Sequence, residues 1–530
     1  MSPFAGTGML VRAAVRRDRI QLIAWVAGLL LLLLSTASSF SSLYPTVDDR
    51  LAVARSIETT PSFRALYGVV YNPTSLGSLV AWRLVGGLVL GLGLMNLLLT
   101  VRHTRGDEES GRAELIGAGA VGRLAPIASA FALTGLANLA FVVIAAVGLT
   151  AMGLGAAGSL ALPLTVAVAG WVFAGVAALT AQLARTARGA GGLAGAALGL
   201  AYLLRVAGDA GNGVLSWLSP MGWAQQTRAF ADERWWLPAL SLAVAGVFAA
   251  AAVAMAARRD LGAGVLPDRA GRATAAPSLS GPFGLAWRLQ RGVLIGWAAG
   301  FAAVGAVVGA IAKDVGSFVD NSPQMADYIR QIGGEDAIVD AYVSAVLGLL
   351  AMAAAGYVLQ ATLRIRGEET STRAEQVLAG SVSRWSWAAG HVVCAAVGTA
   401  VVLAAAGVTM GLAHGLRTGD VAGQLPRLVE SALVQVPAAW VLGGLAILLI
   451  GFAPRALALA WAALGAVILI GWIGPALELP QAVLDVSPFT HTPLFPLTDV
   501  TWTPLVLLAA VAAALALAGL SGLRRRDLGP

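Results

Sequence analysis

The chain has 530 residues, of which 58% are hydrophobic and only 12% are charged. Soluble proteins carry about 25% charged residues, so this composition excludes a soluble globular protein. The net charge of +7 comes from arginine, because Lys313 is the sole lysine. The single cysteine, Cys394, excludes a disulfide within the chain and a cysteine-based metal cluster, and the four scattered histidines offer no ligand spacing.

Apolar runs of roughly 20 residues recur along the chain, and each is long enough to cross a bilayer as a helix. Backbone groups in lipid must bond to each other, which favours helices, and the short alternating segments of a membrane barrel are absent. The expected spans of the first half are 20–43, 78–101, 124–151, 160–183, 189–207 and 236–257. Those of the second half are 293–312, 341–363, 386–413, 430–452, 456–474 and 502–522. The sequence therefore predicts an all-α integral membrane protein with twelve transmembrane helices.

The N-terminal segment precedes the first span. Residues 8–19 mix arginines with apolar positions, and we expect a short helix lying in the cytoplasmic interface. A cleavable signal peptide is the alternative, because arginines, an apolar run and small residues follow one another there. The same pattern recurs in mid-chain, which favours a retained span. The outer loop after this span, 44–77, carries Asp48 and Asp49 among apolar positions, so we expect it to be ordered.

A charged loop follows the second span, where residues 105–114 read RGDEESGRAE. Glu108 and Arg112 are four residues apart, a spacing that stabilises a short helix by about 0.3–0.5 kcal/mol. Acidic residues contribute little to membrane topology, so positive-inside bias does not explain them. The functional hypothesis is a docking element for a cytoplasmic partner. The alternative is a solvated loop helix with an internal ion pair.

Two features of the fifth span have structural interpretations. Gly191, Gly195 and Gly199 recur every four residues, which predicts a face packed closely against another helix. Arg205 and Asp209 are also four residues apart, near the end of this span. We expect them to form a local pair or an interface anchor rather than a substrate site.

The middle of the chain is predicted to connect two membrane halves. Residues 263–282 contain glycine, proline and arginine, as expected of a cytoplasmic linker. The amphipathic stretch Phe283–Arg291 is predicted to be a second interfacial helix. A long outer loop, 313–340, follows the next span, as 44–77 does in the first half.

The second half repeats both the charged loop and the end of the first half. Residues 366–375 read RGEETSTRAE, and Glu369 and Arg373 are again four residues apart. The sequence RRDLG closes both halves, at 258–262 and at 525–529. We call these two copies the tags. Internal repeats of this kind indicate a tandem duplication.

The repeat defines the expected domains, a first half at 1–262 and a second half at 283–530, each with six spans. Because both halves have the same sense in the membrane, we expect a parallel duplication with a pseudo-twofold axis along the membrane normal. A loop pattern kept in both copies favours the docking hypothesis over the solvated loop. The candidate docking residues are Arg105, Asp107, Glu108, Glu109, Arg112, Glu114, Arg366, Glu368, Glu369, Arg373 and Glu375.

The arginines between the spans predict the topology. With the N-terminus in the cytoplasm, most of the 35 basic residues lie on the cytoplasmic side, and the opposite assignment would reverse the positive-inside bias. We therefore expect a multi-pass protein of the cell membrane with both termini in the cytoplasm. The same distribution argues against a nucleic-acid partner, because the basic residues are explained by topology.

The charged loops carry a family resemblance. A motif of the form Arg-Gly-acid-Glu followed by Arg-x-Glu, after the second of six spans, resembles the coupling helix of ABC permeases of the type-two exporter class. The fused length and the stretch GRAELIGAGAVGR look like actinobacterial exporters of polyketide antibiotics. The resemblance implies export of a hydrophobic or amphiphilic compound, with one ATP-binding cassette subunit docked under each half. Thr370 in place of Glu109, and Leu378 in place of Gly117, depart from the first copy and leave the equivalence of the two loops open.

A phosphate-binding loop needs Gly-Lys-Ser/Thr, and the sole lysine, Lys313, is followed by Asp314. We therefore expect no catalytic residue, cofactor or metal in this chain, and ATP and Mg²⁺ bound by the separate subunit. Residues that bind the substrate are not readable from the sequence. The alternative function is an ion-coupled secondary transporter with two parallel six-span repeats.

Overall fold

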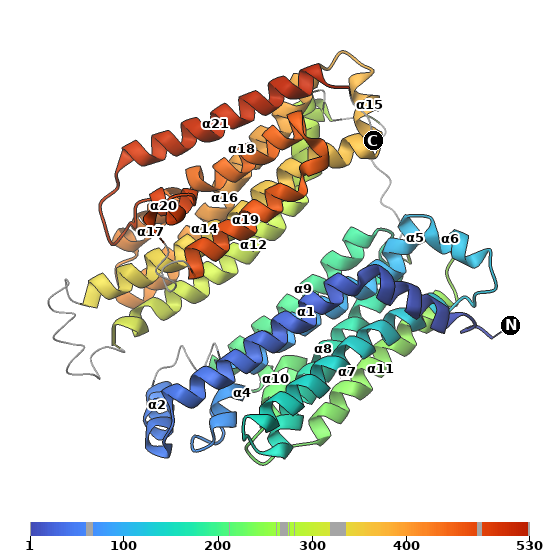
Figure 1. The fold of residues 1–530 in the computed structure, drawn as a ribbon, viewed down its shortest axis with the longest axis vertical. Helices are drawn as coiled ribbons and strands as arrows, with labels where there is room; N and C mark the ends of the chain where they lie inside the picture. Colours follow the sequence, from blue (N-terminus) through green and yellow to red (C-terminus); the bar gives the residue numbers. More distant parts are fainter. Residues whose placement is uncertain are drawn as a thin grey trace. The chain divides into compact units, whose positions relative to one another are not determined.

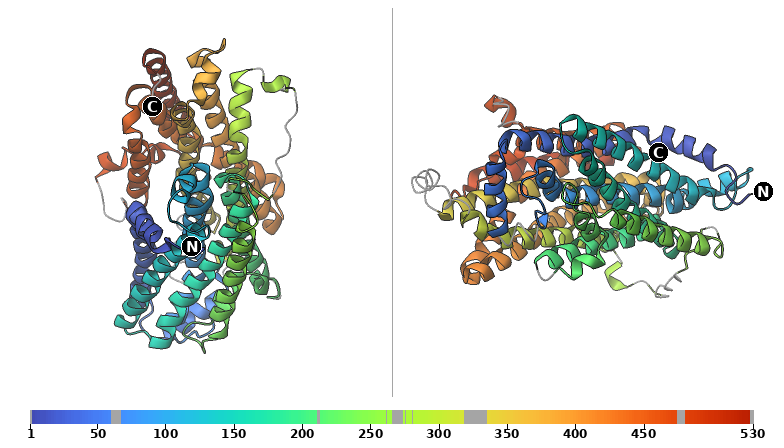
Figure 2. Two further views of the ribbon diagram at one scale, coloured as in Figure 1. Left: turned by 90° about the vertical axis from the view of Figure 1, so that its right-hand side faces the viewer. Right: turned by 90° about the horizontal axis from the view of Figure 1, so that it is seen from below.

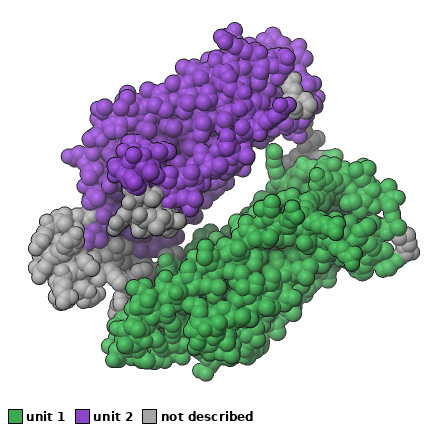
Figure 3. Space-filling view, viewed as in Figure 1, with its two compact units in different colours: residues 1–270 green, residues 271–530 purple. Residues whose placement is uncertain are grey.

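A computed structural model describes residues 2–59, 67–210, 213–260, 262–265, 274, 276–279, 281–317, 335–473 and 480–527. The described chain divides into two compact units, 1–270 and 271–530, which Figure 3 colours separately. Each unit is a bundle of long helices running side by side (Figure 1, Figure 2), and the described residues form no strand. This confirms the predicted helical class. Half of the predicted linker, 263–282, lies outside the described residues.

The elements of unit 1 follow in chain order. They are α1 (Thr7–Leu43), α2 (Val47–Thr59), α4 (Leu76–Val101), the π-helix η1 (Arg102–Gly106), α5 (Asp107–Glu109), α6 (Arg112–Gly117), α7 (Ala125–Ala151), α8 (Ala156–Leu183), α9 (Ala187–Ala210), η2 (Leu215–Leu218), α10 (Pro220–Gln226) and α11 (Trp236–Ala256).

The elements of unit 2 also follow in chain order. They are η3 (Pro277–Leu279), α12 (Pro282–Ser317), α14 (Glu335–Thr370), α15 (Arg373–Leu378), α16 (Arg384–Thr418), α17 (Val421–Leu433), α18 (Val436–Phe452), η4 (Pro454–Ala456), α19 (Ala458–Ile473), α20 (Gln481–Leu484), η5 (Pro488–His491) and α21 (Trp502–Arg525).

Eleven helices in the described part of the chain are long and apolar enough to cross a membrane. The remaining predicted span, 456–474, falls on α19, which has 16 residues. At 1.5 Å per residue such a helix measures roughly 24 Å, less than the ~30 Å of the hydrocarbon core. Length and composition of the described helices therefore support a multi-pass membrane protein with eleven candidate spans, and the twelfth is not confirmed.

The two predicted interfacial helices are not separate elements, and this part of the prediction was wrong. Residues 8–19 are the first turns of α1, which runs unbroken for 37 residues, and Phe283–Arg291 likewise begins the 36-residue α12. No proline or left-handed residue interrupts the chain at either junction. In α1 the buried Asp18 also ties these first turns to the end of α4, which keeps them in line with the span.

The outer loops are only partly described. The first loop contains α2, which confirms an ordered element there, and its residues 60–66 lie outside the described part. Most of the second loop, 318–334, also lies outside it.

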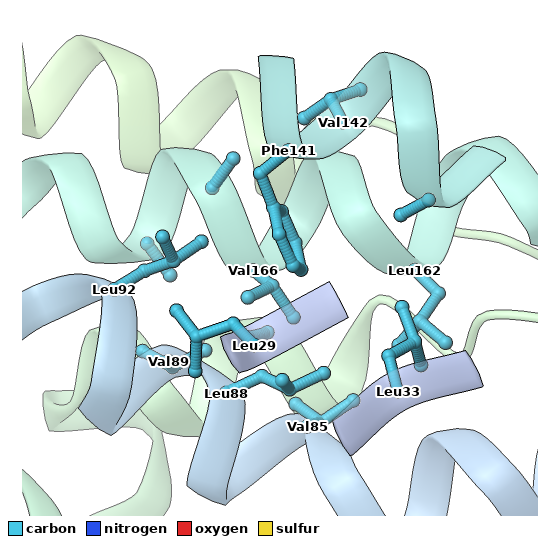
Figure 4. Packing of buried hydrophobic residues seen from close by; sticks show 14 of the residues in the cluster. Leu29, Leu33, Val85, Leu88, Val89, Leu92, Phe141, Val142, Leu162 and Val166 are labelled. Atoms are coloured by element: carbon cyan, nitrogen blue, oxygen red, sulfur yellow. The ribbon is translucent and has the colours of Figure 1, made fainter. Parts of the chain in front are cut away.

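The fourth long helix is the centre of both bundles. In unit 1, α8 packs against α4, α7, α9 and α11, and in unit 2, α18 packs against the corresponding α14, α16, α19 and α21. The first helix of each unit, α1 or α12, contacts the second and third. Figure 4 shows the core of unit 1, where Phe141 of α7, Val166 of α8 and Leu88 of α4 come together. The same helix pairs are thus in contact in both units.

Glycines allow the fourth and sixth long helices of unit 2, α18 and α21, to approach each other closely. A Cβ atom added to Gly451 of α18 would lie 2.2 Å from the carbonyl oxygen of Gly519 in α21. The two backbones are therefore in direct contact. By contrast, no described atom of unit 1 lies within 4 Å of a Cβ placed on Gly191, Gly195 or Gly199, so the close packing predicted for that face of α9 is not found within this unit.

These contacts predict opposite effects of two identical substitutions. Gly451→Ala should destabilise the chain by about 1–3 kcal/mol, because its methyl group meets backbone that must move. Gly465→Ala in α19, where nothing lies within 4 Å of the new methyl group, should stabilise it by about 0.5 kcal/mol through helix propensity. Thermal unfolding of the purified chain in detergent measures both. Equal shifts in the two variants would contradict the packing described for α18 and α21.

Candidate functional site

The acidic clusters lie at the ends of the second long helices rather than on separate loop helices, which corrects the sequence prediction. In unit 1 the helix of α4 continues through η1 and α5 to Glu109, and in unit 2 α14 continues to Thr370. The chain then turns at Gly111 (φ 73°) and at Thr372 (φ 57°), both in the left-handed region. Only α6 and α15, which begin after these turns, are short loop helices (Figure 1).

The turn also overturns the predicted ion pairs between residues four apart. Glu108 and Arg112 lie on opposite sides of the left-handed residue 111, so helical spacing no longer brings them together. Arg112 instead lies 3.6 Å from Asp107. In unit 2, Arg373 lies 3.9 Å from Glu368 rather than pairing with Glu369.

Glu108 is held between two arginines of unit 1, and we call Arg105, Glu108 and Arg259 the first clasp. Arg105 donates from Nη1 to Glu108 Oε2 at 2.7 Å, and Arg259 donates from Nη2 to Oε1 at 2.5 Å. Arg105 also donates to the carbonyl oxygens of Ala181 and Ala263 at 2.9 and 2.8 Å. The Arg105 side chain is only 1% exposed. The end of α4 is thereby attached to the segment that follows α11.

Unit 2 builds the same arrangement from Arg366, Glu369 and Arg526, the second clasp. Arg366 donates from Nη1 to Glu369 Oε2 at 2.9 Å, and Arg526 donates from Nη2 to Oε1 and Oε2 at 2.6 and 2.7 Å. The Glu369 side chain is 1% exposed. Each clasp unites a repeated loop motif with the second arginine of a repeated tag.

The far end of each loop reaches the same tag residue. Arg123, after α6, donates from Nη2 to the carbonyl oxygen of Arg259 at 2.5 Å. Arg384, at the start of α16, donates from Nη1 to the carbonyl oxygen of Arg526 at 2.8 Å. Residue 259 or 526 therefore holds the loop of its unit at both ends. Position 261 and positions 528–529 of the tags lie outside the described residues.

The electrostatics explain why each carboxylate needs two arginines. The C-terminal end of a helix carries a partial negative charge, so acids there are unfavourable unless cations compensate. Burial strengthens this requirement, because an unpaired buried charge costs several kcal/mol. Charge-assisted hydrogen bonds from two guanidinium groups meet it in both units.

The remaining acids of the two copies have diverged in their contacts. Asp107 accepts from Arg17 of α1 at 3.0 Å, whereas Glu368 lies 3.3 Å from Arg364 of its own helix. Glu109 accepts from the backbone N–H of Ala187 at 2.8 Å, which caps the start of α9.

Thr370 replaces that glutamate in unit 2 and donates to the carbonyl oxygen of Arg366 at 3.0 Å. The cap on the fifth helix seen in unit 1 is therefore not reproduced by this residue. The departure noted in the sequence thus has a structural consequence in the loop that carries it.

The exposed part of the site lies on the short helices. Arg112 and Glu114 of α6 are exposed, as are Arg373 and Glu375 of α15. Leu115 of α6 is 79% exposed and offers an apolar surface beside these charges. The two short helices therefore present these four candidate residues to solvent. The glutamates of the clasps, Glu108 and Glu369, are by contrast only 13% and 1% exposed in their side chains.

Two contributions were missed by sequence reasoning. The tag arginines Arg259 and Arg526 were interpreted only as topology signals, although the repetition of RRDLG was visible. Asp18 was not singled out at all, yet it is buried. It forms an ion pair with Arg102, whose Nη2 lies 2.7 Å from Oδ1, and its Oδ2 is hydrogen-bonded to His103 Nε2 at 2.6 Å. An acid inside a run of arginines was the available signal.

Comparison with known proteins agrees with this architecture. The family model described as "Multidrug efflux system permease Rv1217c, C-terminal domain" matches residues 279–524. The multidrug efflux system permease protein Rv1217c of Mycobacterium tuberculosis (strain ATCC 25618 / H37Rv) is 43% identical over 530 residues, covering 99% of this chain and 96% of the relative. The chain belongs to this family of efflux permeases. The similarity extends over both units, so the sequence regions that form the two clasps of this efflux permease lie within it.

The second clasp predicts a favourable coupling energy between Glu369 and Arg526, and no such coupling for the neighbouring Arg525. Arg526→Ala and Glu369→Ala should each destabilise the permease by about 3 kcal/mol, because each leaves a buried charge without its partner. The double variant should be about 1–3 kcal/mol more stable than the sum of the two losses predicts. Arg525→Ala is the matched control, since Arg525 is exposed and should change stability by less than about 0.5 kcal/mol. Additive losses in thermal unfolding would show that the second clasp does not form.

Proposed function

We propose that this chain is the membrane-spanning permease of an ATP-driven exporter of the type-two ABC class. It transports hydrophobic or amphiphilic, drug-like compounds out of the cell through the cytoplasmic membrane. A separate ATP-binding subunit supplies the energy, with two copies docked on α6 and α15. The relative's name refers to a multidrug efflux system, and we extend that substrate class to this chain.

The observation that carries the proposal is the pair of clasps beneath two exposed short helices. A solvated loop would leave its acids in water. Here the Glu108 side chain is 13% exposed and that of Glu369 is 1% exposed, and both are bonded to arginines from a distant part of the same unit. A rigidly held loop can transmit a displacement to the spans that it joins. Two such loops, one in each unit, match a motor with two copies.

The candidate docking residues divide into two roles under this proposal. Arg105, Glu108, Arg366 and Glu369 anchor the loops, since their polar atoms are bonded within the unit. The docking contacts themselves fall to the exposed Arg112, Glu114, Arg373 and Glu375. Leu115 adds an apolar contact in the first loop.

The topology supports the same assignment. The tags and both loops gather arginines at one end of each unit, which we place in the cytoplasm together with both chain termini. The matching helix contacts within the two units support a parallel duplication. ATP and Mg²⁺ belong to the partner, because the sole lysine does not sit in a phosphate-binding loop.

The driving force separates this function from an ion-coupled transporter. Inverted membrane vesicles that contain the permease and its ATP-binding partner should accumulate ethidium or doxorubicin, two fluorescent amphiphiles, when ATP is added. Vanadate should stop the uptake and a protonophore should not. Uptake by the permease alone, driven by a proton gradient, would establish the ion-coupled alternative, and no ATP-dependent uptake of either dye would contradict the proposal.

Charge reversal on the exposed helices tests the docking surface. The double variant Glu114→Arg, Glu375→Arg should reduce co-purification of the ATP-binding subunit at least tenfold, or about 1.4 kcal/mol, without changing thermal unfolding of the permease alone. Asp48→Arg is the matched control, because Asp48 is an exposed acid at the opposite end of unit 1. Normal co-purification of the double variant would place the docking surface elsewhere.

A further inference from the structure

We propose that Arg259 and Arg526 are positioning residues of the transport cycle. Each joins the cytoplasmic loop of its unit to the last helix, so that a displacement of α6 or α15 moves α11 or α21 with it. The inference rests on the proposed function and adds the route by which docking acts on the spans.

The first step is that one residue holds both ends of the loop. The Arg259 guanidinium bonds to Glu108, before α6, and its carbonyl oxygen accepts from Arg123, after α6. Arg526 bonds to Glu369 and accepts from Arg384 in the same way. A loop held at two points by one residue cannot rotate about that residue, so its displacement is passed on.

The second step is that the clasps join helices that are otherwise apart. Among the described residues, α4 and α11 both pack against α8 but not extensively against each other, and α14 and α21 have the same relation to α18. Glu108 and Arg259 are 151 residues apart in the chain. The clasp is therefore the direct connection between the inner ends of the second and sixth long helices.

The third step continues the route into the centre of each bundle. The sixth helix touches the fourth at glycines: a Cβ on Gly175 of α8 would lie 3.1 Å from the carbonyl oxygen of Ala245 in α11. In unit 2, Gly451 of α18 meets Gly519 of α21 backbone to backbone. Helices in such close contact cannot move independently, because densely packed interiors have low compressibility and transmit displacement. A displacement of α11 is thus transmitted to α8, and a displacement of α21 to α18.

The adjacent tag arginines show that topology alone does not explain these residues. Arg258 and Arg525 are exposed, and any arginine at this place would satisfy the positive-inside bias. The Arg259 and Arg526 side chains are instead 8% and 17% exposed and bonded to the loop acids. Retention of this difference in both tags points to a role inside the protein.

Coupling between ATP hydrolysis and transport is the first test. In proteoliposomes that contain the ATP-binding partner, Arg259→Gln with Arg526→Gln should lower ethidium or doxorubicin transported per ATP hydrolysed at least tenfold, while the partner still binds and hydrolyses ATP. Arg258→Gln with Arg525→Gln is the control and should keep the wild-type ratio. A wild-type ratio in the first variant would overturn the inference, whereas failure of the wild-type complex to transport either dye would instead overturn the proposed function.

A covalent replacement of the second clasp separates positioning from folding. Glu369→Cys with Arg526→Cys, in a Cys394→Ala background, should lose coupling because the loop is released. A short bifunctional methanethiosulfonate reagent that bridges the two thiols should restore it, and a reductant should abolish it again. Failure of the bridged protein to recover would overturn the inference, because a link of any chemistry should transmit the movement.

Discussion

Two carboxylates at the negative ends of long helices constrain the loop-bearing end of each unit of this permease. Glu108 and Glu369 occupy positions that the helix dipole disfavours, and both are largely removed from water. Each is compatible with folding only because two guanidinium groups reach it, one from its own helix and one from the end of the sixth long helix. The requirement to pair these charges brings the second and sixth helices together where packing does not.

A comparison of the two units shows which features accompany this constraint in both. The two units differ at the start of the fifth helix, where Glu109 caps α9 and Thr370 has no such role. They also differ in the contacts of Asp107, which bonds to Arg17, and of the equivalent Glu368, which lies near Arg364. They agree in four positions, which are Arg105, Glu108, Arg123 and Arg259 in unit 1 and Arg366, Glu369, Arg384 and Arg526 in unit 2. A set of four residues that meets in space in both units is the expected result of a shared mechanical role rather than of topology alone.

Much of the fold was predictable from the sequence, because apolar runs and arginine-rich loops report directly on the bilayer. The loop was predicted as a charged element, but its pairing was not: Gly111 and Thr372 adopt left-handed backbone, which spacing rules do not anticipate for Thr372. The second arginine bonded to Glu108 or Glu369 lies more than 150 residues away, so local patterns cannot reveal it. The burial of Asp18 in α1 is equally non-local, because its partner Arg102 lies in η1, at the end of α4.

The most direct measurement is an electron cryomicroscopy structure of the permease with its ATP-binding partner in a lipid nanodisc. The account predicts Arg259 and Arg526 within hydrogen-bond distance of Glu108 and Glu369, with α6 and α15 facing the partner. Tag arginines extended into solvent, or the two glutamates bonded to the partner instead, would contradict it.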